Sequence, residues 1–393
     1  MKQQPISQLL GSLLEDLEPL MDFLTASTWA QRQGDPTIAD LVVGNPHDEP
    51  LPALTDAIER HATPTGPAHF AYNLGDESAR RAAADSLQRT QGLTVAWEDV
   101  FLTPGTFGAI SVALRTVVDP GDEVIYIRPP WFFYGPMIRA AGGDPVPVMA
   151  SQPDFDLDLD AIAGAISPRT RAILINSPNN PSGRIYPEAT LRALGALLED
   201  ASARSERRIY LLSDESYARI LYDGNAAISP ARFYDATLLL YTYGKTLLAP
   251  GERLGYIAVP GVMPDREQLE PALLLSQIVG GWQIPNTVMQ YALPELEQHV
   301  IDLKRLQRRR DLVVDELRGA GYELLKPEGT FYILARSPID DEKTFVEQLA
   351  ARDVFVLPGY TFELPGWFRI SLTGSDAMIE RALPAFREIA NAR

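Results

Sequence analysis

The chain has 393 residues, of which 46% are hydrophobic and 22% are charged, and its formal net charge is −17 at pH 7. This length and composition predict a globular protein with two domains and substantial cores. The acidic balance argues against nucleic acid as a partner, because phosphate backbones are bound by basic surfaces. The chain contains no cysteine, which excludes disulfides and thiolate nucleophiles. No window is apolar enough for a membrane span or a signal core, so we expect a cytoplasmic protein without a membrane partner.

The first part of the chain predicts a helical arm. Leucines and a methionine recur at helical spacing through residues 6–30, with Pro19 as a candidate break. This apolar stripe is long enough to cover a partner chain or a second domain. Residues 41–46 predict a short strand that ends in a turn at Gly44, and residues 70–75 precede a further predicted helix.

A strand predicted over residues 100–103 is followed by a glycine turn that opens a helix. Gly105, Thr106 and Phe107 form the start of that helix. A helix N-terminus presents free backbone N–H groups and the positive end of the helix dipole to an anion. Because such turns are common between strands and helices, this one indicates a phosphate site only in combination with a downstream lysine.

Two later strands lead into loops of unusual composition. The strand predicted at residues 121–127 precedes an aromatic loop that contains Trp131. Core packing is the simplest explanation of these aromatic residues. The strand predicted at residues 171–175 precedes a turn rich in asparagine, proline and glycine that contains Asn180.

An acidic residue follows the next predicted strand. Residues 208–213 are apolar and lead into Asp214, with Tyr217 three residues later. A carboxylate at the end of a buried strand is costly unless a cation pairs with it. This position therefore indicates a partner of positive charge.

A lysine interrupts two apolar runs. Residues 238–243 predict a strand, Gly244 ends it, and Lys245 precedes a second apolar run. Thr242 lies three residues before the lysine and Arg253 eight residues after it. A solvated loop lysine is the alternative, but a hydroxyl, an amine and a guanidinium that converge at strand ends suit an anionic phosphate that bears an aldehyde.

The pattern changes after about residue 285. Strands that alternate with helices through residues 100–260 predict a mainly parallel sheet covered on both faces, with functional residues at the carboxyl ends of its strands. A long predicted helix at residues 299–317, followed by short strands and one more helix, predicts a small α+β unit. Arg369 lies in the middle of its last strand, where an exposed edge position is the alternative to a site that binds a carboxylate.

Taken in this order, the segments resemble the class I and II aminotransferases of pyridoxal-phosphate (PLP) fold type I, the aspartate aminotransferase superfamily. The resemblance implies an α/β fold with a large PLP-binding domain over residues 48–290, built on a mainly parallel seven-stranded sheet between helices. It implies a smaller α+β domain formed by residues 1–47, with the helical arm, and residues 291–393. It also implies a homodimer.

The resemblance implies three catalytic residues. Lys245 would form the Schiff base with the cofactor and then carry the proton between the substrate Cα and the cofactor. Asp214 would keep the pyridine nitrogen protonated, so that the ring accepts electrons. Tyr217 would donate a hydrogen bond to the 3-oxygen of the cofactor and tune the Schiff base.

Further contacts follow from the resemblance. The implied cofactor-binding residues, besides the three catalytic ones, are Gly105, Thr106 and Phe107 at the phosphate, Thr242 and Arg253 beside it, Trp131 on the ring and Asn180 at the 3-oxygen. The family carries a tyrosine that reaches the phosphate of the neighbouring subunit. In this chain that position holds Phe70, and Tyr72 two residues later is the candidate replacement. Gly44, Asn180 and Arg369 are the implied substrate-binding residues.

The resemblance implies transfer of an amino group between an L-amino acid and a 2-oxo acid. We find no second arginine for a distal carboxylate, so a neutral or aromatic side chain is favoured. A PLP lyase, synthase or cyclising enzyme, such as a carbon-sulfur lyase or an aminocyclopropane-carboxylate-synthase-like enzyme, is the main alternative. A PLP-sensing regulator is the last one, since it needs a DNA-binding module for which there is no room before residue 41. We expect no metal site, because the four histidines form no ligand pair.

Overall fold

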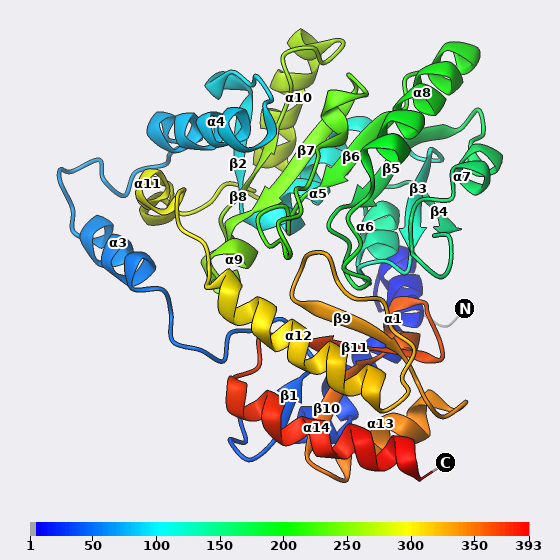
Figure 1. The fold of residues 1–393 in the computed structure, drawn as a ribbon. Helices are drawn as coiled ribbons and strands as arrows, with labels where there is room; N and C mark the ends of the chain where they lie inside the picture. The colour runs from blue at the N-terminus through cyan, green and yellow to red at the C-terminus, as the bar shows by residue number, and fades with distance from the viewer. Residues whose placement is uncertain (1–4, 393) are drawn as a thin grey trace.

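The computed structural model describes residues 5–392 (Figure 1). The helices are α1 (Gln8–Ala26), α2 (Thr28–Gln31), α3 (Pro52–Ala62), α4 (Glu77–Gln91), α5 (Gly105–Val117), α6 (Tyr134–Ala140), α7 (Leu159–Ala165), α8 (Glu188–Ser205), α9 (Tyr243–Thr246), α10 (Arg266–Val279), α11 (Thr287–Leu296), α12 (Leu303–Gly319), α13 (Glu342–Ala350) and α14 (Asp376–Asn391). The strands are β1 (Ala39–Leu41), β2 (Val100–Thr103), β3 (Glu123–Arg128), β4 (Asp144–Met149), β5 (Thr170–Asn176), β6 (Tyr210–Asp214), β7 (Thr237–Thr242), β8 (Gly255–Ala258), β9 (Tyr332–Arg336), β10 (Val354–Pro358) and β11 (Trp367–Ser371). Short 3-10 helices lie at Trp97–Asp99, Pro230–Arg232, Pro250–Glu252 and Gly359–Phe362.

The larger sheet confirms the predicted mainly parallel α/β architecture. Its seven strands are in the order β2-β8-β7-β6-β5-β3-β4, and β8 runs in the opposite direction to the other six. Helices lie on both sides of this sheet (Figure 1). Strands β6, β7 and β8 are buried along their whole length, as expected for strands that are covered on both faces.

The carboxyl ends of the central strands bring the predicted polar residues together. Strands β5, β6 and β7 are neighbours in the sheet and are parallel to one another. Their last residues are Asn176, Asp214 and Thr242, and Asn176 is the register partner of Asp214. These side chains therefore lie along one edge of the sheet, which is where open α/β sheets bind their ligands.

The second sheet joins the two ends of the chain. It has four strands in the order β1-β10-β11-β9, and β1 from the N-terminal part pairs in parallel with β10. The expected contribution of the N-terminal segment to the small unit is thus present, whereas domain limits at residues 48 and 290 stay a prediction. Strand β11 lies between β10 and β9, and Arg369 is buried within it. An exposed edge position for Arg369 is therefore wrong.

Two local predictions differ from the structure. Helix α1 continues through Pro19, which lies inside it, because Leu13, Leu20 and Phe23 bury one face of the helix on both sides of the proline. The strand expected from residue 41 instead covers residues 39–41, since its register is set by pairing with β10. None of the helices in residues 5–392 is long and apolar enough to cross a bilayer.

Candidate active site

A cavity of about 170 Å³ lies between the two sheets. It is several times larger than the volume of one water molecule, so it can hold part of a small ligand. The predicted residues that line it are Gly44, Thr106, Phe107, Trp131, Asn180, Asp214, Tyr217, Thr242, Lys245, Arg253 and Arg369. Segments that are far apart in the sequence therefore meet in one place.

Lys245 reaches the cavity from a short helix. Thr242, the last residue of β7, caps α9 by accepting a hydrogen bond from the backbone N–H of Gly244 at 3.1 Å. This cap turns the chain so that Lys245 leaves the sheet edge. Its Nζ lies 6.0 Å from the ring centroid of Tyr217 and 5.7 Å from that of Phe331. The amine is thus held between aromatic faces and is only half-buried.

Gly244 has a steric reason to be glycine. A Cβ at this position would lie 3.1 Å from the Cα of Pro250 and 3.3 Å from the Oγ1 of Thr242. A serine would therefore require a small shift of the backbone at Pro250. Thr242 also donates its hydroxyl proton to the carbonyl of Leu254 at 3.2 Å. The Thr242 hydroxyl therefore makes two hydrogen bonds to the local backbone, although the side chain also lines the cavity.

Asp214 is a buried carboxylate with several donors. It accepts hydrogen bonds from the hydroxyl of Tyr134 at 2.6 Å and from the backbone N–H of Ser216 at 3.0 Å. Burial raises the pKa of Asp214, and the hydrogen bonds from Ser216 and Tyr134 and the charge of Lys245 oppose this rise without cancelling it. The negative charge of the ionised carboxylate is therefore only partly compensated, and a cation in the cavity would stabilise it.

The start of α5 and Arg253 form a cradle for an anion. Gly105 has φ +75°, and a Cβ there would lie 2.8 Å from the Nη2 of Arg253. Arg253 donates to the carbonyls of Pro104 and Pro250, both at 2.7 Å. In the described chain no side chain caps the N-terminus of this 13-residue helix. Its first N–H groups are thus available to a phosphate.

Arg369 presents a buried guanidinium to the cavity. Its Nη1 donates to the Oδ1 of Asn180 at 3.0 Å, and its Nη2 donates to the carbonyl of Val42 at 2.9 Å. Its Nε is buried without a hydrogen-bond partner in the described residues. Burial lowers the pKa of Arg369, although Tyr332 and Tyr217 act in the opposite direction. A carboxylate would supply the missing negative charge.

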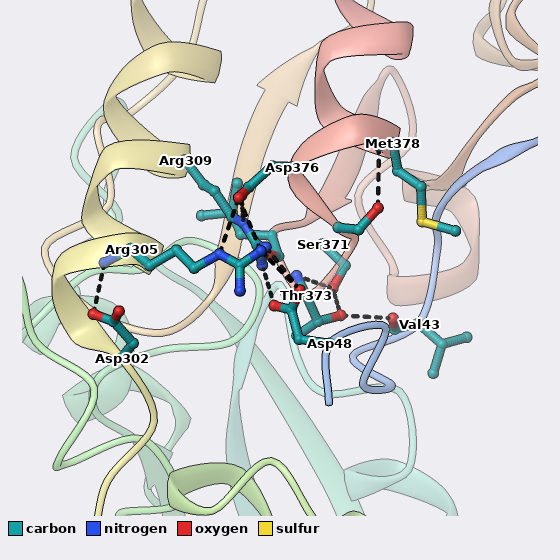
Figure 2. A network of polar contacts seen from close by, with 11 residues as sticks. Val43, Asp48, Asp302, Arg305, Arg309, Ser371, Thr373, Asp376 and Met378 are labelled. Carbon is teal, nitrogen blue, oxygen red and sulfur yellow. Dashed lines mark hydrogen bonds and ion pairs between the residues drawn. The ribbon is translucent and has the colours of Figure 1, made fainter. Parts of the chain in front are cut away.

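An ion network holds the loop at residues 43–48 (Figure 2). The first part of this loop lines the cavity. Asp48 pairs with Arg305 at 3.1 Å and with Arg309 at 2.8 Å. The same two arginines pair with Asp376 at the start of α14. Because Arg309 is buried, these pairs fix the loop between α12 and α14.

Gly44 leaves room for two aromatic side chains. A Cβ at this position would overlap the hydroxyl of Tyr332 and the ring of Phe331. The role expected for Gly44, close approach of the backbone to the substrate, stays a prediction. The sequence did not predict that Tyr332 lies next to Gly44. Residues 44 and 332 come together only because β1, which precedes the loop, and β9 belong to the same sheet.

Three more cavity residues were also missed. In the sequence, Tyr134 is one of several aromatic residues in a loop, and Ser216 stands between Asp214 and Tyr217. Their position beside predicted site residues is the only signal that could have identified them. The hydroxyl of Ser216 lies 2.8 Å from that of Thr106 and donates to Asp214. Asn176 donates to the backbone carbonyl of Asp214 at 2.8 Å. These residues support the carboxylate and the helix start.

Tyr72 lies outside the cavity of its own chain. Its side chain is 90% exposed, and its ring centroid lies 5.0 Å from that of Trp282. Phe70 is also exposed. The expected contact of Tyr72 with the phosphate of a neighbouring subunit involves a second copy of the chain and remains a prediction.

Comparisons with known proteins agree with this geometry. A family profile described as "Aminotransferase class I and II" matches residues 36–386. The aspartate/prephenate aminotransferase of Thermus thermophilus is 33% identical over 371 residues, which cover 91% of this chain and 92% of that protein. The aromatic-amino-acid aminotransferase 2 of Thermococcus litoralis is 30% identical over 376 residues, which cover 91% and 92%. A solved structure of an amino transferase from Eubacterium rectale has a TM-score of 0.88 and 30% identity, with 99% of both chains covered.

The chain belongs to the class I and II aminotransferases. It is a transaminase that depends on pyridoxal phosphate, and the predicted fold class and cofactor are confirmed. The cavity fits this cofactor, since Asp214 offers a buried carboxylate, Lys245 an amine, and the start of α5 with Arg253 an anion cradle.

Proposed function

We propose that this transaminase transfers an amino group between a neutral or aromatic L-amino acid and a 2-oxo acid, with Lys245, Asp214 and Arg369 as its central residues. The observation that carries this proposal is the meeting of these three side chains, from α9, β6 and β11, in one cavity. An amine, a buried carboxylate and a buried guanidinium are the groups that an amino-acid substrate and a pyridine ring need.

Arg369 binds the α-carboxylate of the substrate. Its hydrogen bonds to Asn180 and to the carbonyl of Val42 fix the plane of the guanidinium, and its Nε, which has no hydrogen-bond partner in the described residues, is left for a substrate oxygen. A bidentate contact sets the orientation of the substrate as well as its affinity. Orientation decides which bond at Cα stands perpendicular to the ring, and hence which bond breaks.

Lys245 holds and moves the proton. Pyridoxal phosphate, when bound, supplies a conjugated electron sink for the charge that develops at the substrate Cα. The Nζ of Lys245 would take the proton from the substrate Cα and pass it to the cofactor. Asp214 would hold the protonated pyridine nitrogen with its carboxylate, and Tyr217 would donate a hydrogen bond to the 3-oxygen. The start of α5, with Gly105, Thr106 and Phe107, and Arg253 would bind the phosphate, beside which Thr242 caps α9.

The wall of the cavity supports an apolar substrate side chain. Phe107, Trp131 and Phe132 line one side of it, and the ring centroids of Phe107 and Trp131 lie 4.8 Å apart. Trp131 thus offers an aromatic face to the cofactor ring as well. Of the described cavity residues, the cations are Lys245, Arg253 and Arg369, and each has a role other than binding a second carboxylate. A neutral or aromatic side chain is therefore favoured over an acidic one.

The exposed apolar residues support a homodimer. Phe70, Tyr72 and Leu74 are exposed in one loop, and Trp282 lies beside Tyr72. Leu275, Ile278 and Val279 are exposed at the end of α10, next to the loop that contains Trp282. A second copy of the chain would cover these groups and bring Tyr72 to the phosphate of its partner. The domain limits at residues 48 and 290 and the cytoplasmic location belong to the same proposal.

A donor screen tests the proposed substrate class. The purified protein is supplied with pyridoxal phosphate and either 2-oxoglutarate or pyruvate, and products are identified by mass for phenylalanine, leucine and aspartate as donors. We expect kcat/KM for phenylalanine or leucine to exceed that for aspartate by at least about tenfold, or ~1.4 kcal/mol. A preference for aspartate would contradict the substrate class, and elimination or ring closure in place of amino transfer would contradict the reaction.

A further inference from the structure

Phe331 lies directly before β9 and faces the proposed catalytic lysine. Its side chain is buried, and the Nζ of Lys245 lies over its ring, 5.7 Å from the ring centroid. An ammonium group over an aromatic face is attracted by the charge distribution of the ring. Phe331 is not among the described residues that line the cavity. Its contact with the site therefore runs through the lysine side chain.

Neighbouring groups fix the ring of Phe331. It packs edge-to-face against the ring of Tyr217, with the ring centroids 5.4 Å apart at an interplanar angle of 86°. Its centroid lies 4.9 Å from that of the Tyr332 ring. A Cβ on Gly44 would lie 2.6 Å from the Cε2 of Phe331, so the glycine leaves the space that the ring fills. The ring thus has little room to move and presents a fixed face to the lysine.

The residue before this ring has an unusual backbone conformation. Thr330 is buried, and its φ is +67°, in the left-handed region. A β-branched residue rarely adopts this region, because its side chain then crowds the backbone. Such a conformation costs free energy and persists only where the surrounding structure holds it, as it often does at functional sites.

Hydrogen bonds hold Thr330 in this conformation. Its N–H donates to the carbonyl of Ile220 at 2.9 Å, and its carbonyl accepts a hydrogen bond from the hydroxyl of Tyr222. Its Oγ1 accepts from the backbone N–H of Tyr332 at 3.0 Å. These bonds join the backbone before Phe331 to the loop after β6, and so they set the direction in which the ring leaves the chain.

We propose that Thr330 and Phe331 act together as positioning residues for Lys245. The left-handed backbone at Thr330 directs the ring of Phe331 at the amine, and the ring restricts the positions of the amine before it reacts. The inference rests on the proposed role of Lys245.

The step that gains from this restriction is the attachment of the cofactor. The neutral amine of Lys245 attacks the aldehyde carbon, a C=N bond forms, and the aldehyde oxygen leaves as water with the two amine protons. A lysine side chain is long and flexible, so a fixed amine lowers the entropic cost of this bond. Loss of the ring should therefore weaken the covalent part of cofactor binding and leave the contacts to the cofactor ring and phosphate as they are.

Binding of two ligands to the full chain without cofactor tests the proposal. Pyridoxal phosphate can bond to Lys245, whereas 4-deoxypyridoxine 5′-phosphate carries a methyl group in place of the aldehyde. The ratio of the two Kd values therefore isolates the contribution of the amine. In Phe331→Leu we expect the Kd for pyridoxal phosphate to rise about tenfold and that for the deoxy compound to change by less than about twofold.

Further variants separate the ring from the backbone. Phe331→Met fills much of the space without an aromatic face, so it should match Phe331→Leu. Thr330→Val keeps the shape of the side chain but removes the acceptor for the N–H of Tyr332, so the Kd for pyridoxal phosphate should also rise about tenfold. Thr330→Gly adopts a positive φ without strain and should stay within about threefold of the wild type. The control Phe345→Leu shortens a buried ring in the core of the small unit and should change neither Kd.

Lys245→Ala separates this inference from the proposed function. If it binds pyridoxal phosphate as tightly as the wild type, Lys245 does not hold the cofactor, and the proposed function fails together with the inference. If Lys245→Ala loses affinity for pyridoxal phosphate but Phe331→Leu does not, or if Phe331→Leu weakens both ligands equally, only the inference is overturned. A wild-type Kd in Thr330→Val, or a loss in Thr330→Gly as large as in Thr330→Val, overturns the part given to Thr330.

Discussion

Replacement of Arg369 by lysine keeps the positive charge at the proposed binding site for the substrate carboxylate. It removes the planar guanidinium, whose paired N–H groups can bind both carboxylate oxygens. In the structure Arg369 lines the cavity and donates to Asn180 and to the carbonyl of Val42, and its Nε has no hydrogen-bond partner in the described residues. An ammonium group is smaller and cannot serve both protein acceptors and two carboxylate oxygens. The variant should therefore bind the substrate carboxylate through one hydrogen bond in place of two.

The magnitude follows from one lost charge-assisted hydrogen bond. Such a bond contributes about 1.5–3 kcal/mol, which corresponds to a fall of about 10-fold to 150-fold in kcat/KM. The loss should appear with amino acids only, because a simple amine has no carboxylate for Arg369 to bind. For a simple amine we expect a change of less than about threefold.

The assay compares kcat/KM for phenylalanine and for 2-phenylethylamine in the wild type, Arg369→Lys and the control Arg336→Lys. Arg336 lies on the neighbouring strand, is exposed and pairs with Glu323, so its replacement should change neither substrate's rate. Equal losses for the amino acid and the amine in Arg369→Lys would show that this arginine supports the structure and does not read the carboxylate.

Three further predictions follow. Asp214→Ala should lower kcat by more than about tenfold, or ~1.4 kcal/mol, because no carboxylate then faces the cofactor nitrogen, and a smaller loss in steady-state kinetics would argue against this role. Glu215 is buried, and burial raises its pKa from 4.5 to about 7 despite hydrogen bonds from Ser229 and Ser213. The folded state therefore holds this proton longer than the unfolded state, so stability falls as pH rises from about 4.5 through about 7, and Glu215→Gln should remove part of that fall in urea unfolding at several pH values. A wild-type slope that Glu215→Gln leaves unchanged would refute this assignment. Sedimentation at micromolar concentration should give a dimer, and a single species of 43.3 kDa would refute the homodimer.

Much of the fold could be predicted because the apolar runs and the turns agree with it. The runs predicted at residues 171–175, 208–213 and 238–243 are short and bounded by polar or glycine residues, and they form neighbouring parallel strands, with Asn176 opposite Asp214 and Asp214 opposite Leu240. Lys245 was identifiable because a lysine is rarely found at the end of a buried strand unless its amine has a partner. Its place on the short helix α9 was not predicted, since the cap from Thr242 depends on backbone geometry.

Contacts across the chain could not be read from local patterns. Tyr332 approaches Gly44 and Arg369 only because β1, β9 and β11 belong to one sheet. A proline inside a helix usually ends or kinks it, yet burial of the apolar face on either side of Pro19 keeps α1 continuous. In both cases tertiary packing decided an outcome that the residue types alone left open.

Reduction with borohydride identifies the lysine that binds the cofactor. Lys245 is the lysine that lines the cavity beside Asp214, Arg253 and Arg369 in the described structure. The purified protein is loaded with pyridoxal phosphate, reduced, digested and analysed by mass spectrometry, with Lys245→Ala as the control. We expect one reduced pyridoxyl adduct, located on Lys245 and absent from Lys245→Ala. An adduct on another lysine of the wild type, or no adduct at all, would contradict it.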